Sequence, residues 1–214
     1  MKNDRFTEVI IPRCVSNNFI ISIQRTGFTD SVITGFVITY NDSFLCLEII
    51  DEEYRKNGLC IVRISDIDHY AVAEDESCFK YVLQKKLSLK PSNTMLTLDN
   101  CDSISSLLRS LQRFDGLIGI ERELKDDVLC VGLVLSVKNK VFWFLEVDSD
   151  AEWVRPFQYK LDDITKISVS GGYMDALWAV AKGELDNYIR ECSKMEKSII
   201  IDISPKPVVF KRKT

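Results

Sequence analysis

The chain is poor in the residues and motifs from which most active sites are built. It has one histidine, His69, and none of the patterns Gly-x-Ser-x-Gly, Gly-x-x-x-x-Gly-Lys or His-Glu-x-x-His. These patterns supply a serine nucleophile, a phosphate-binding loop and a zinc site, respectively. A lone histidine is far more often a surface or half-buried residue than a general base. We therefore predict a non-enzymatic protein with no catalytic residues and no cofactor.

Seven cysteines are present, but none forms a Cys-x-x-Cys pair. Most lie in apolar runs such as FLCLEII and DVLCVGLVL, where a reduced cysteine behaves as a small hydrophobic residue. With one histidine beside them, they argue against a metal site. The N-terminal sequence MKNDRFTEVIIPR has no apolar signal region, and no run reaches the ~18 to 20 apolar residues of a membrane span. We expect a cytoplasmic location and no membrane contact.

The chain also lacks an excess of positive charge. Its 28 Lys and Arg against 32 Asp and Glu give a net charge of −4. This balance disfavours broad nucleic-acid binding, which relies on a basic face to displace counterions. Two interpretations of the acidity remain, because it can attract a basic partner or serve solubility alone.

What the sequence does contain is a long internal repeat. Residues 20–84 align without a gap on residues 117–181, at a spacing of 97 given by Gly132 minus Gly35. Identical pairs include Ile21 and Ile118, Arg25 and Arg122, Val37 and Val134, Asp51 and Asp148, Asp66 and Asp163, and Val72 and Val169. An internal repeat is evidence about architecture and predicts two related domains.

Each copy reads as about five strands followed by a helix. In the first copy we predict strands at 19–25, 33–40, 44–50, 59–64 and within 65–72, a turn at Asn57-Gly58, and a helix over 74–84. In the second we predict strands at 117–122, 129–137, 141–147, 158–161 and 165–169, a helix over 173–194, and a last strand at 199–203. Phe6–Ile11 is predicted as an extra strand ended by Pro12. A helix from Ser103 to Phe114, capped by Asp102 or Ser103, precedes the second copy only.

The glycine shared by both copies lies inside the second predicted strand. Glycine at such a position marks a sharp bend or a close backbone approach, and a bend of this kind curls a small sheet into a barrel. We predict a first domain at 1–86, a linker at 87–101 and a second domain at 102–214.

Five strongly bent strands with a glycine in the second strand, led by a helix in the second copy, resemble the Sm-like small barrel. The resemblance implies a mainly β fold with α: two tandem Sm-like five-stranded small barrels, each followed by a helix. Sm-like proteins that bind RNA carry a polar motif in the strand 2 to 3 turn and an Arg-Gly in the last hairpin. Here Arg63 is followed by Ile64 and Lys160 by Leu161, so the Arg-Gly is missing. The chain also resembles tandem-barrel bacterial proteins, among them immunity proteins of contact-dependent inhibition (toxin–immunity) systems.

Two acidic segments follow the third predicted strand of each copy and are the candidate partner-binding residues. They are Asp51, Glu52, Glu53 and Tyr54 in the first copy, and Asp148, Asp150, Glu152, Trp153 and Arg155 in the second. Tyr, Trp and Arg anchor protein interfaces, and carboxylates steer a basic partner by long-range attraction. The alternative interpretation is that both segments are solvated turns whose aromatic ring folds back onto its own barrel.

From these features we predict a protein-binding module, an immunity protein that binds and neutralises a basic toxin nuclease domain. The alternative is an Sm-like RNA-binding or ribonucleoprotein adaptor, which rests on fold analogy and would need a basic groove. The lysines that could form one, Lys85, Lys86, Lys138 and Lys140, are few and scattered, so direct nucleic-acid binding is disfavoured. The oligomeric state is not determined by the sequence.

Overall fold

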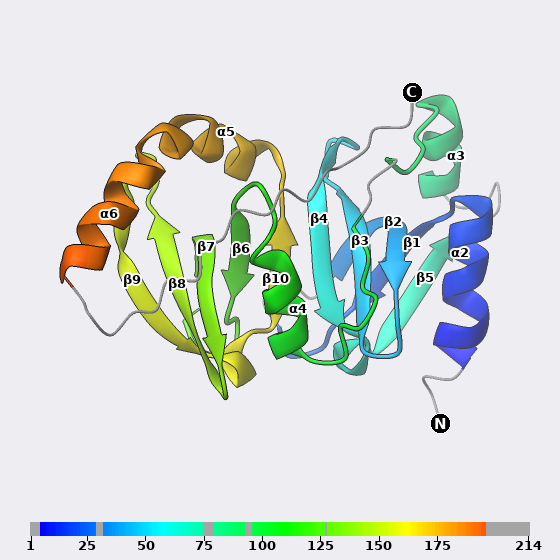
Figure 1. The fold of residues 1–214 in the computed structure, drawn as a ribbon. Helices are drawn as coiled ribbons and strands as arrows, with labels where there is room; N and C mark the ends of the chain where they lie inside the picture. The colour runs from blue at the N-terminus through cyan, green and yellow to red at the C-terminus, as the bar shows by residue number, and fades with distance from the viewer. Residues whose placement is uncertain (1–4, 29–31, 75–78, 93–95, 127, 196–214) are drawn as a thin grey trace. The chain divides into compact units, whose positions relative to one another are not determined.

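The computed structural model describes residues 5–28, 32–74, 79–92, 96–126 and 128–195. The fold is mainly β with α-helices, and the chain divides into two compact units with a boundary between Asp102 and Ser103. Figure 1 shows the strands of the first unit in blue to cyan and those of the second in green to yellow. Each unit contains five antiparallel strands and has helices before and after them.

Unit 1 begins with a helix and ends with another. Its helices are the π-helical turn η1 (Phe6–Ile10), α2 (Ile11–Asn17), the short 3₁₀ helix η2 (Ile64–Asp66) and α3 (Phe79–Lys86). Its strands are β1 (Ile20–Gln24), β2 (Val32–Tyr40), β3 (Phe44–Ile50), β4 (Lys56–Arg63) and β5 (His69–Ala73). The strand order is β5-β1-β2-β3-β4.

Unit 2 repeats this plan. Its helices are α4 (Ile104–Leu111), the 3₁₀ helix η3 (Leu161–Asp163), α5 (Gly172–Ala181), the 3₁₀ turn η4 (Lys182–Glu184) and α6 (Leu185–Met195). Its strands are β6 (Ile118–Glu121), β7 (Leu129–Lys138), β8 (Val141–Val147), β9 (Trp153–Lys160) and β10 (Lys166–Val169). The strand order β10-β6-β7-β8-β9 is that of unit 1 with every strand replaced by its counterpart.

The spacing of 97 residues also holds in the strand pairing. Gly35 pairs with Ile21 and Ile49, and Gly132 pairs with the equivalent Ile118 and Glu146. The register shifts between Val37 and Thr39 in β2, and between Val134 and Ser136 in β7. A bulge bends its strand and increases its twist, so β2 and β7 are bent at equivalent points.

The shared glycine is required because the neighbouring strand leaves no room for a side chain. A Cβ built on Gly35 would overlap the carbonyl oxygen of Glu48 and lie 2.9 Å from the carbonyl carbon. A Cβ built on Gly132 would overlap the carbonyl oxygen of Leu145 and lie 2.8 Å from the carbonyl carbon. The prediction of a close backbone approach is confirmed, and its partner is the next strand of the same sheet.

The helix after the strands covers an apolar cluster in each unit. In unit 1, Tyr81 of α3 packs on a cluster that contains Ile20, Phe36 and Ile50. In unit 2, Trp178 of α5, the counterpart of Tyr81, packs on a cluster of Leu117, Val131, Val147, Met174, Leu177 and Ala181. The helix that follows the strands is therefore part of the repeat.

The prediction of a strand at Phe6–Ile11 is wrong, because this segment is helical and leads into α2. Pro12 lies in the first turn of α2, where a missing backbone N–H costs little. Ile11 and Cys14 are buried in the core of unit 1. Unit 1 therefore has a leading helix, as unit 2 does.

Three further boundaries differ from those predicted. Asn57-Gly58 lies inside β4 rather than in a turn, with Gly58 at φ 75°, and the turn is formed earlier, at Asp51 to Arg55. The strand β9 begins at Trp153 rather than Gln158, and its Pro156 is accommodated because β9 is the edge strand of its unit. The helix predicted over 173–194 is interrupted at η4, and the strand predicted at 199–203 lies outside the described residues.

Part of the segment predicted as a linker is fastened to unit 1. The side-chain amide of Asn41 donates to the carbonyl oxygens of Leu98 and Cys101, at 2.9 and 2.7 Å. Its Oδ1 accepts from the backbone N–H groups of Ser43 and Phe44. One side chain thus shapes the β2–β3 turn and holds the residues that precede unit 2.

No helix in the described part of the chain has the length and apolarity to cross a membrane.

Candidate functional site

The two acidic segments form the same turn between the third and fourth strands of their units. Asp51 Oδ1 accepts from the backbone N–H groups of Glu53 and Arg55, at 3.0 and 2.8 Å. Asp148 Oδ1 accepts from those of Asp150 and Glu152, at 3.0 and 2.9 Å. Both aspartates therefore shape the backbone of their turns.

Side chains at equivalent places in the two turns differ in charge. In unit 1 two carboxylates of the turn are paired internally, because Arg55 Nε lies 3.2 Å from Asp51 Oδ2 and the same guanidinium pairs with Glu53. The counterpart of Arg55, 97 residues later, is Glu152. In the described part of the chain, no Lys or Arg lies within ion-pair distance of Asp148, Asp150 or Glu152.

The hydrogen bonds of Asp51 also perturb its ionisation. The backbone N–H of Arg55 holds the pKa of the Asp51 carboxyl below its usual value, and the Arg55 side chain and the backbone of Glu53 act in the same direction. A carboxylate that accepts several hydrogen bonds is favoured in its charged form. The charge of Asp51 is thus part of what holds the turn.

The two aromatic residues of these segments are half-buried against their own units. Tyr54 packs on the apolar cluster under α3. The Trp153 ring packs on the cluster under α5, and its Nε1 donates to the carbonyl oxygen of Ala181 at 2.9 Å. Arg155 is exposed, with its guanidinium 5.2 Å from the centroid of the Phe157 ring. The ring of Trp153 is consequently fixed in position.

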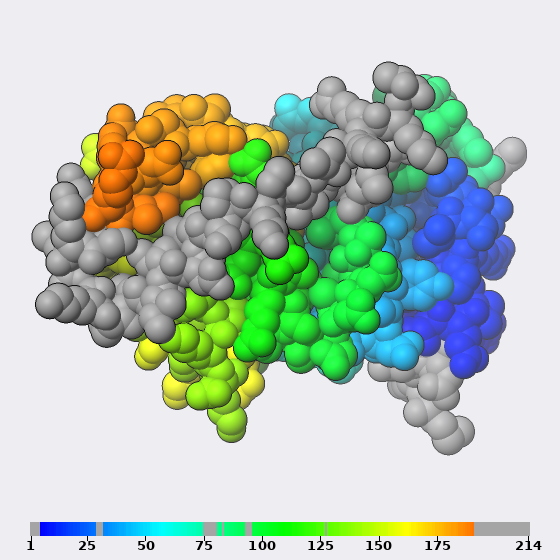
Figure 2. Space-filling model, in the orientation of Figure 1, coloured from blue at the N-terminus to red at the C-terminus, as the bar shows by residue number. Residues whose placement is uncertain are grey.

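Trp153 and Glu152 nevertheless line a groove at the surface of unit 2. The groove has a volume of about 240 Å³ and is formed by Ala151, Glu152, Trp153, Glu184, Asn187 and Tyr188. Figure 2 shows α5 and α6, in orange, at the surface of unit 2. Asn187 Nδ2 donates to Glu184 Oε2 at 3.3 Å and so orients one carboxylate of the groove. Two carboxylates and two aromatic rings thus meet in one place.

Only part of the predicted set is brought together by this groove. Asp148, Asp150 and Arg155 are exposed nearby in sequence but do not line it, and the four residues of the first copy belong to unit 1. Glu184, Asn187 and Tyr188 were not predicted. They belong to the helix predicted over 173–194, and no sequence signal placed that helix against the turn.

A second polar cluster occurs in unit 2, and three of its residues replace apolar residues of unit 1. The Tyr159 hydroxyl donates to Glu146, and the Arg122 guanidinium lies 4.3 Å from the centroid of the Tyr159 ring and pairs with Asp126. Cys130 Sγ lies 3.8 Å from the Tyr159 oxygen. The counterparts of Glu146, Tyr159 and Cys130 in unit 1 are Ile49, Val62 and Ile33.

The contacts of this cluster hold neighbouring strands together. Burial and the hydrogen bond to Glu146 raise the pKa of the Tyr159 phenol, so the group stays protonated and acts as a donor. Burial also raises the pKa of the Cys130 thiol, which leaves little of the nucleophilic thiolate. The cluster ties β7, β8 and β9 to the end of β6.

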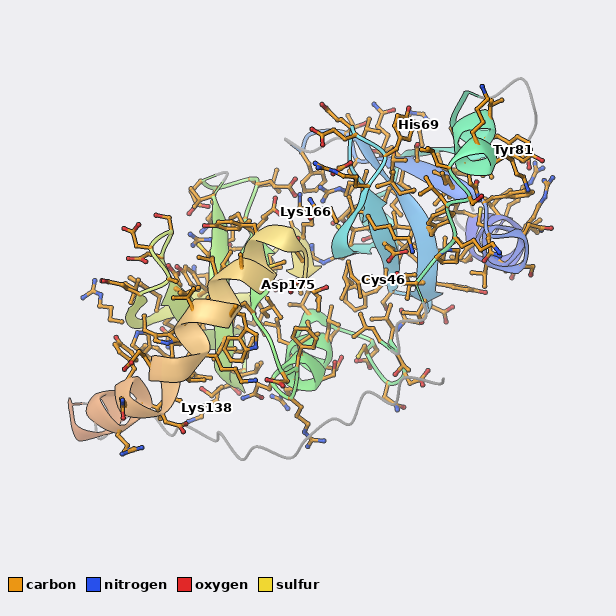
Figure 3. All side chains as sticks on the ribbon, turned by 90° about the horizontal axis from the view of Figure 1, so that it is seen from above. Cys46, His69, Tyr81, Lys138, Lys166 and Asp175 are labelled. Atoms are coloured by element: carbon orange, nitrogen blue, oxygen red, sulfur yellow. The ribbon has the colours of Figure 1, made fainter. Side chains whose placement is uncertain are left out.

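Among the described residues, the cysteines and the histidine do not assemble into a site. The cysteines Cys14, Cys46, Cys60, Cys101 and Cys130 are free and buried. Burial raises the pKa of the Cys14 thiol to about 11. His69 begins β5, and its counterpart Lys166 begins β10 (Figure 3). Each pairs with a residue of the adjacent antiparallel strand, which is β1 for His69 and β6 for Lys166. No group of three metal-ligating side chains occurs among the residues that the structure describes.

Comparison with known proteins gives no match to a family model, a curated protein or a solved structure. The fold and the groove therefore define the class of protein: a two-unit, mainly β chain whose second unit carries an acidic and aromatic groove.

Proposed function

We propose that the chain is a non-enzymatic protein-binding module, an immunity protein that binds and neutralises a basic toxin nuclease domain. The observation that carries the proposal is the groove of unit 2, where Glu152 and Glu184 lie beside Trp153 and Tyr188. Aromatic side chains anchor interfaces, and carboxylates attract and orient a basic partner. The net charge of −4 gives the whole chain the same electrostatic preference.

We infer that each unit is a small barrel of the Sm-like type. Three features support this: the shared strand order, the 3₁₀ helix between the fourth and fifth strands, and the bend at the glycine of the second strand. The leading helices α2 and α4 add a fourth, because each packs on the second strand of its unit. This fold would present the β3–β4 and β8–β9 turns as rigid elements on which a binding site can be built.

The test of the proposed function is neutralisation of a toxin. The chain is co-expressed with the product of the gene next to its own, and cell growth and nucleic-acid cleavage by that product are measured. We expect growth to be rescued and cleavage by the purified product to stop when the chain is added in equimolar amount. A product that neither binds the chain nor loses activity would overturn the proposal.

The second candidate, an Sm-like RNA-binding adaptor, is favoured by the strand order alone. Its test is the fluorescence anisotropy of a labelled single-stranded RNA at physiological salt. Binding of RNA, with no binding of the neighbouring gene product, would favour the adaptor over the immunity protein. We expect no binding, because the described surface of the groove carries carboxylates where an RNA-binding protein needs cations.

A further inference from the structure

The two copies of the acidic turn have the same backbone hydrogen bonds but differ in charge at one position. In unit 1 the Asp51 carboxylate receives two backbone N–H groups on Oδ1 and a guanidinium on Oδ2. In unit 2 the Asp148 carboxylate receives the same two backbone N–H groups on Oδ1. The guanidinium has no counterpart in the second turn, because Glu152 occupies the place of Arg55.

We propose that the groove of unit 2 binds an arginine side chain of the partner protein. The guanidinium would lie between the carboxylates of Glu152 and Glu184, with its plane against the Trp153 ring. This inference rests on the proposed function and names the group that the partner contributes.

The size of the groove fits one side chain. Small-molecule sites usually enclose ~300 to 1,000 Å³, and the groove encloses about 240 Å³. It is therefore too small for a typical cofactor, and its open side admits a side chain that projects from a protein surface.

Arginine fits the lining better than lysine does. A guanidinium is planar, donates to two carboxylates at once and stacks on aromatic faces, whereas an ammonium is a compact and strongly hydrated charge. The chain uses this stacking elsewhere: Arg25 lies 4.7 Å from the Phe28 ring centroid and Arg122 lies 4.3 Å from that of Tyr159.

The lining is also held in place before any partner arrives. The Trp153 ring is fixed by its hydrogen bond to Ala181, and Glu184 is oriented by Asn187. Two hydrogen bonds with Asp148 hold the backbone of Glu152. The Oδ1 atom of Asp148 accepts from the backbone N–H of Glu152, and the backbone N–H of Asp148 donates to the carbonyl oxygen of Glu152. A lining that does not reorganise on binding loses little conformational entropy.

The test uses a tetra-arginine peptide, with tetra-lysine and the uncharged tetra-citrulline as matched probes. Binding is followed by the NMR signals of the Trp153 indole N–H, identified from the Trp153→Phe variant, and of the Glu152 amide. We expect saturable shifts of both signals with arginine, binding at least fivefold weaker with lysine, and no shift with citrulline. Equal shifts with citrulline, or lysine binding as tightly as arginine, would overturn the inference.

Two variants with the same change in charge locate the site. Glu152→Arg places a cation where unit 1 has Arg55 and should weaken arginine-peptide binding at least tenfold. Glu52→Arg makes the same change at an exposed position of the unit 1 turn and should leave the affinity within twofold of the parent. If both variants bind equally well, the groove is not the site. Glu184→Gln is the substitute should Glu152→Arg fail to fold, with an expected loss of at least threefold.

Binding of the neighbouring gene product by the same variants separates this inference from the proposed function. If the product binds the parent and Glu152→Arg equally, the function stands and the arginine site is wrong. If the product does not bind but the arginine peptide does, the groove has the inferred selectivity and the immunity function is wrong. Loss of product binding in Glu152→Arg alone supports both.

Discussion

At the scale of single residues, the equivalent glycines Gly35 and Gly132 mark the point where each sheet bends. Each lies against a carbonyl group of the next strand, with the register shift two residues further along its own strand. Both the bend and the close approach follow from the absence of a Cβ. Because these two glycines occupy the same position of the 97-residue repeat, this feature could be predicted from the sequence.

Replacing Gly132 by alanine should destabilise the protein. The new Cβ would overlap the carbonyl oxygen of Leu145, so β7 and β8 would have to separate, at a cost of about 1 to 3 kcal/mol. Urea unfolding gives the free energy directly. Gly183→Ala is the matched control, since no atom lies within 4 Å of a Cβ at that position. An unchanged unfolding midpoint for Gly132→Ala would show that the two strands do not approach so closely.

Asp51 should make the stability of the protein sensitive to acid. Its pKa is lowered in the folded state by the backbone N–H of Arg55, so folding favours the carboxylate. The stabilisation is present above the usual pKa of 3.8 and is lost as the pH falls below it through the folded-state pKa. We expect the midpoint of thermal unfolding, followed by circular dichroism, to change less between pH 5 and pH 3 in Asp51→Asn than in the parent. Glu52→Gln is the control, and an identical response of parent and Asp51→Asn would contradict the linkage.

The role of Trp153 could be predicted only in part. The sequence showed an aromatic ring beside carboxylates, but its contacts depend on α5 and η4, which lie about 30 residues away in sequence. Hydrophobic periodicity and secondary-structure propensity are local properties of the sequence, so they do not indicate which helix packs against which turn. For the same reason the second half of the groove, Glu184 and Tyr188, was not foreseen.

At the scale of elements, the central strands were the most predictable part. The strand β8 has the predicted bounds, and β3 does also, because both are apolar runs flanked by turn residues. The N-terminal segment was the least predictable. Its apolar residues Phe6, Ile10 and Ile11 suit a short strand as well as a helix, and only packing of Ile11 and Cys14 in the core of unit 1 favours the helix. Short apolar segments are ambiguous in this way.

The β2–β3 turn depends on Asn41, which joins it to the segment before unit 2. In Asn41→Asp the turn keeps its acceptor, but a carboxylate oxygen would face the carbonyl oxygens of Leu98 and Cys101. We expect a loss of about 1 to 3 kcal/mol in unfolding free energy, the cost of leaving such polar groups unpaired. Hydrogen exchange should also quicken at Cys101, whose N–H is bonded to Leu98. The exposed Asp42→Asn, in the same turn, should change neither measurement.

At the scale of the whole molecule, the duplication gives each functional question an internal control. The two units share strand order, bends and turn geometry, so a difference at equivalent positions is a change of side-chain chemistry on the same backbone. The change from Arg55 to Glu152 is such a difference, since the turn around it is preserved. The partner itself could not be predicted, because net charge and fold do not identify the surface that binds it.

The net negative charge should influence how fast a basic partner arrives. We expect the triple variant Asp150→Asn, Glu152→Gln, Glu184→Gln to associate more slowly with the neighbouring gene product, with a rate less dependent on salt. Asp148 is left intact in this variant because it holds the turn. Stopped-flow fluorescence at two salt concentrations measures both quantities. Asp42→Asn, Asp99→Asn, Asp162→Asn removes the same charge from other exposed positions. If the two triple variants slow association equally, the attraction arises from net charge and not from the groove of unit 2.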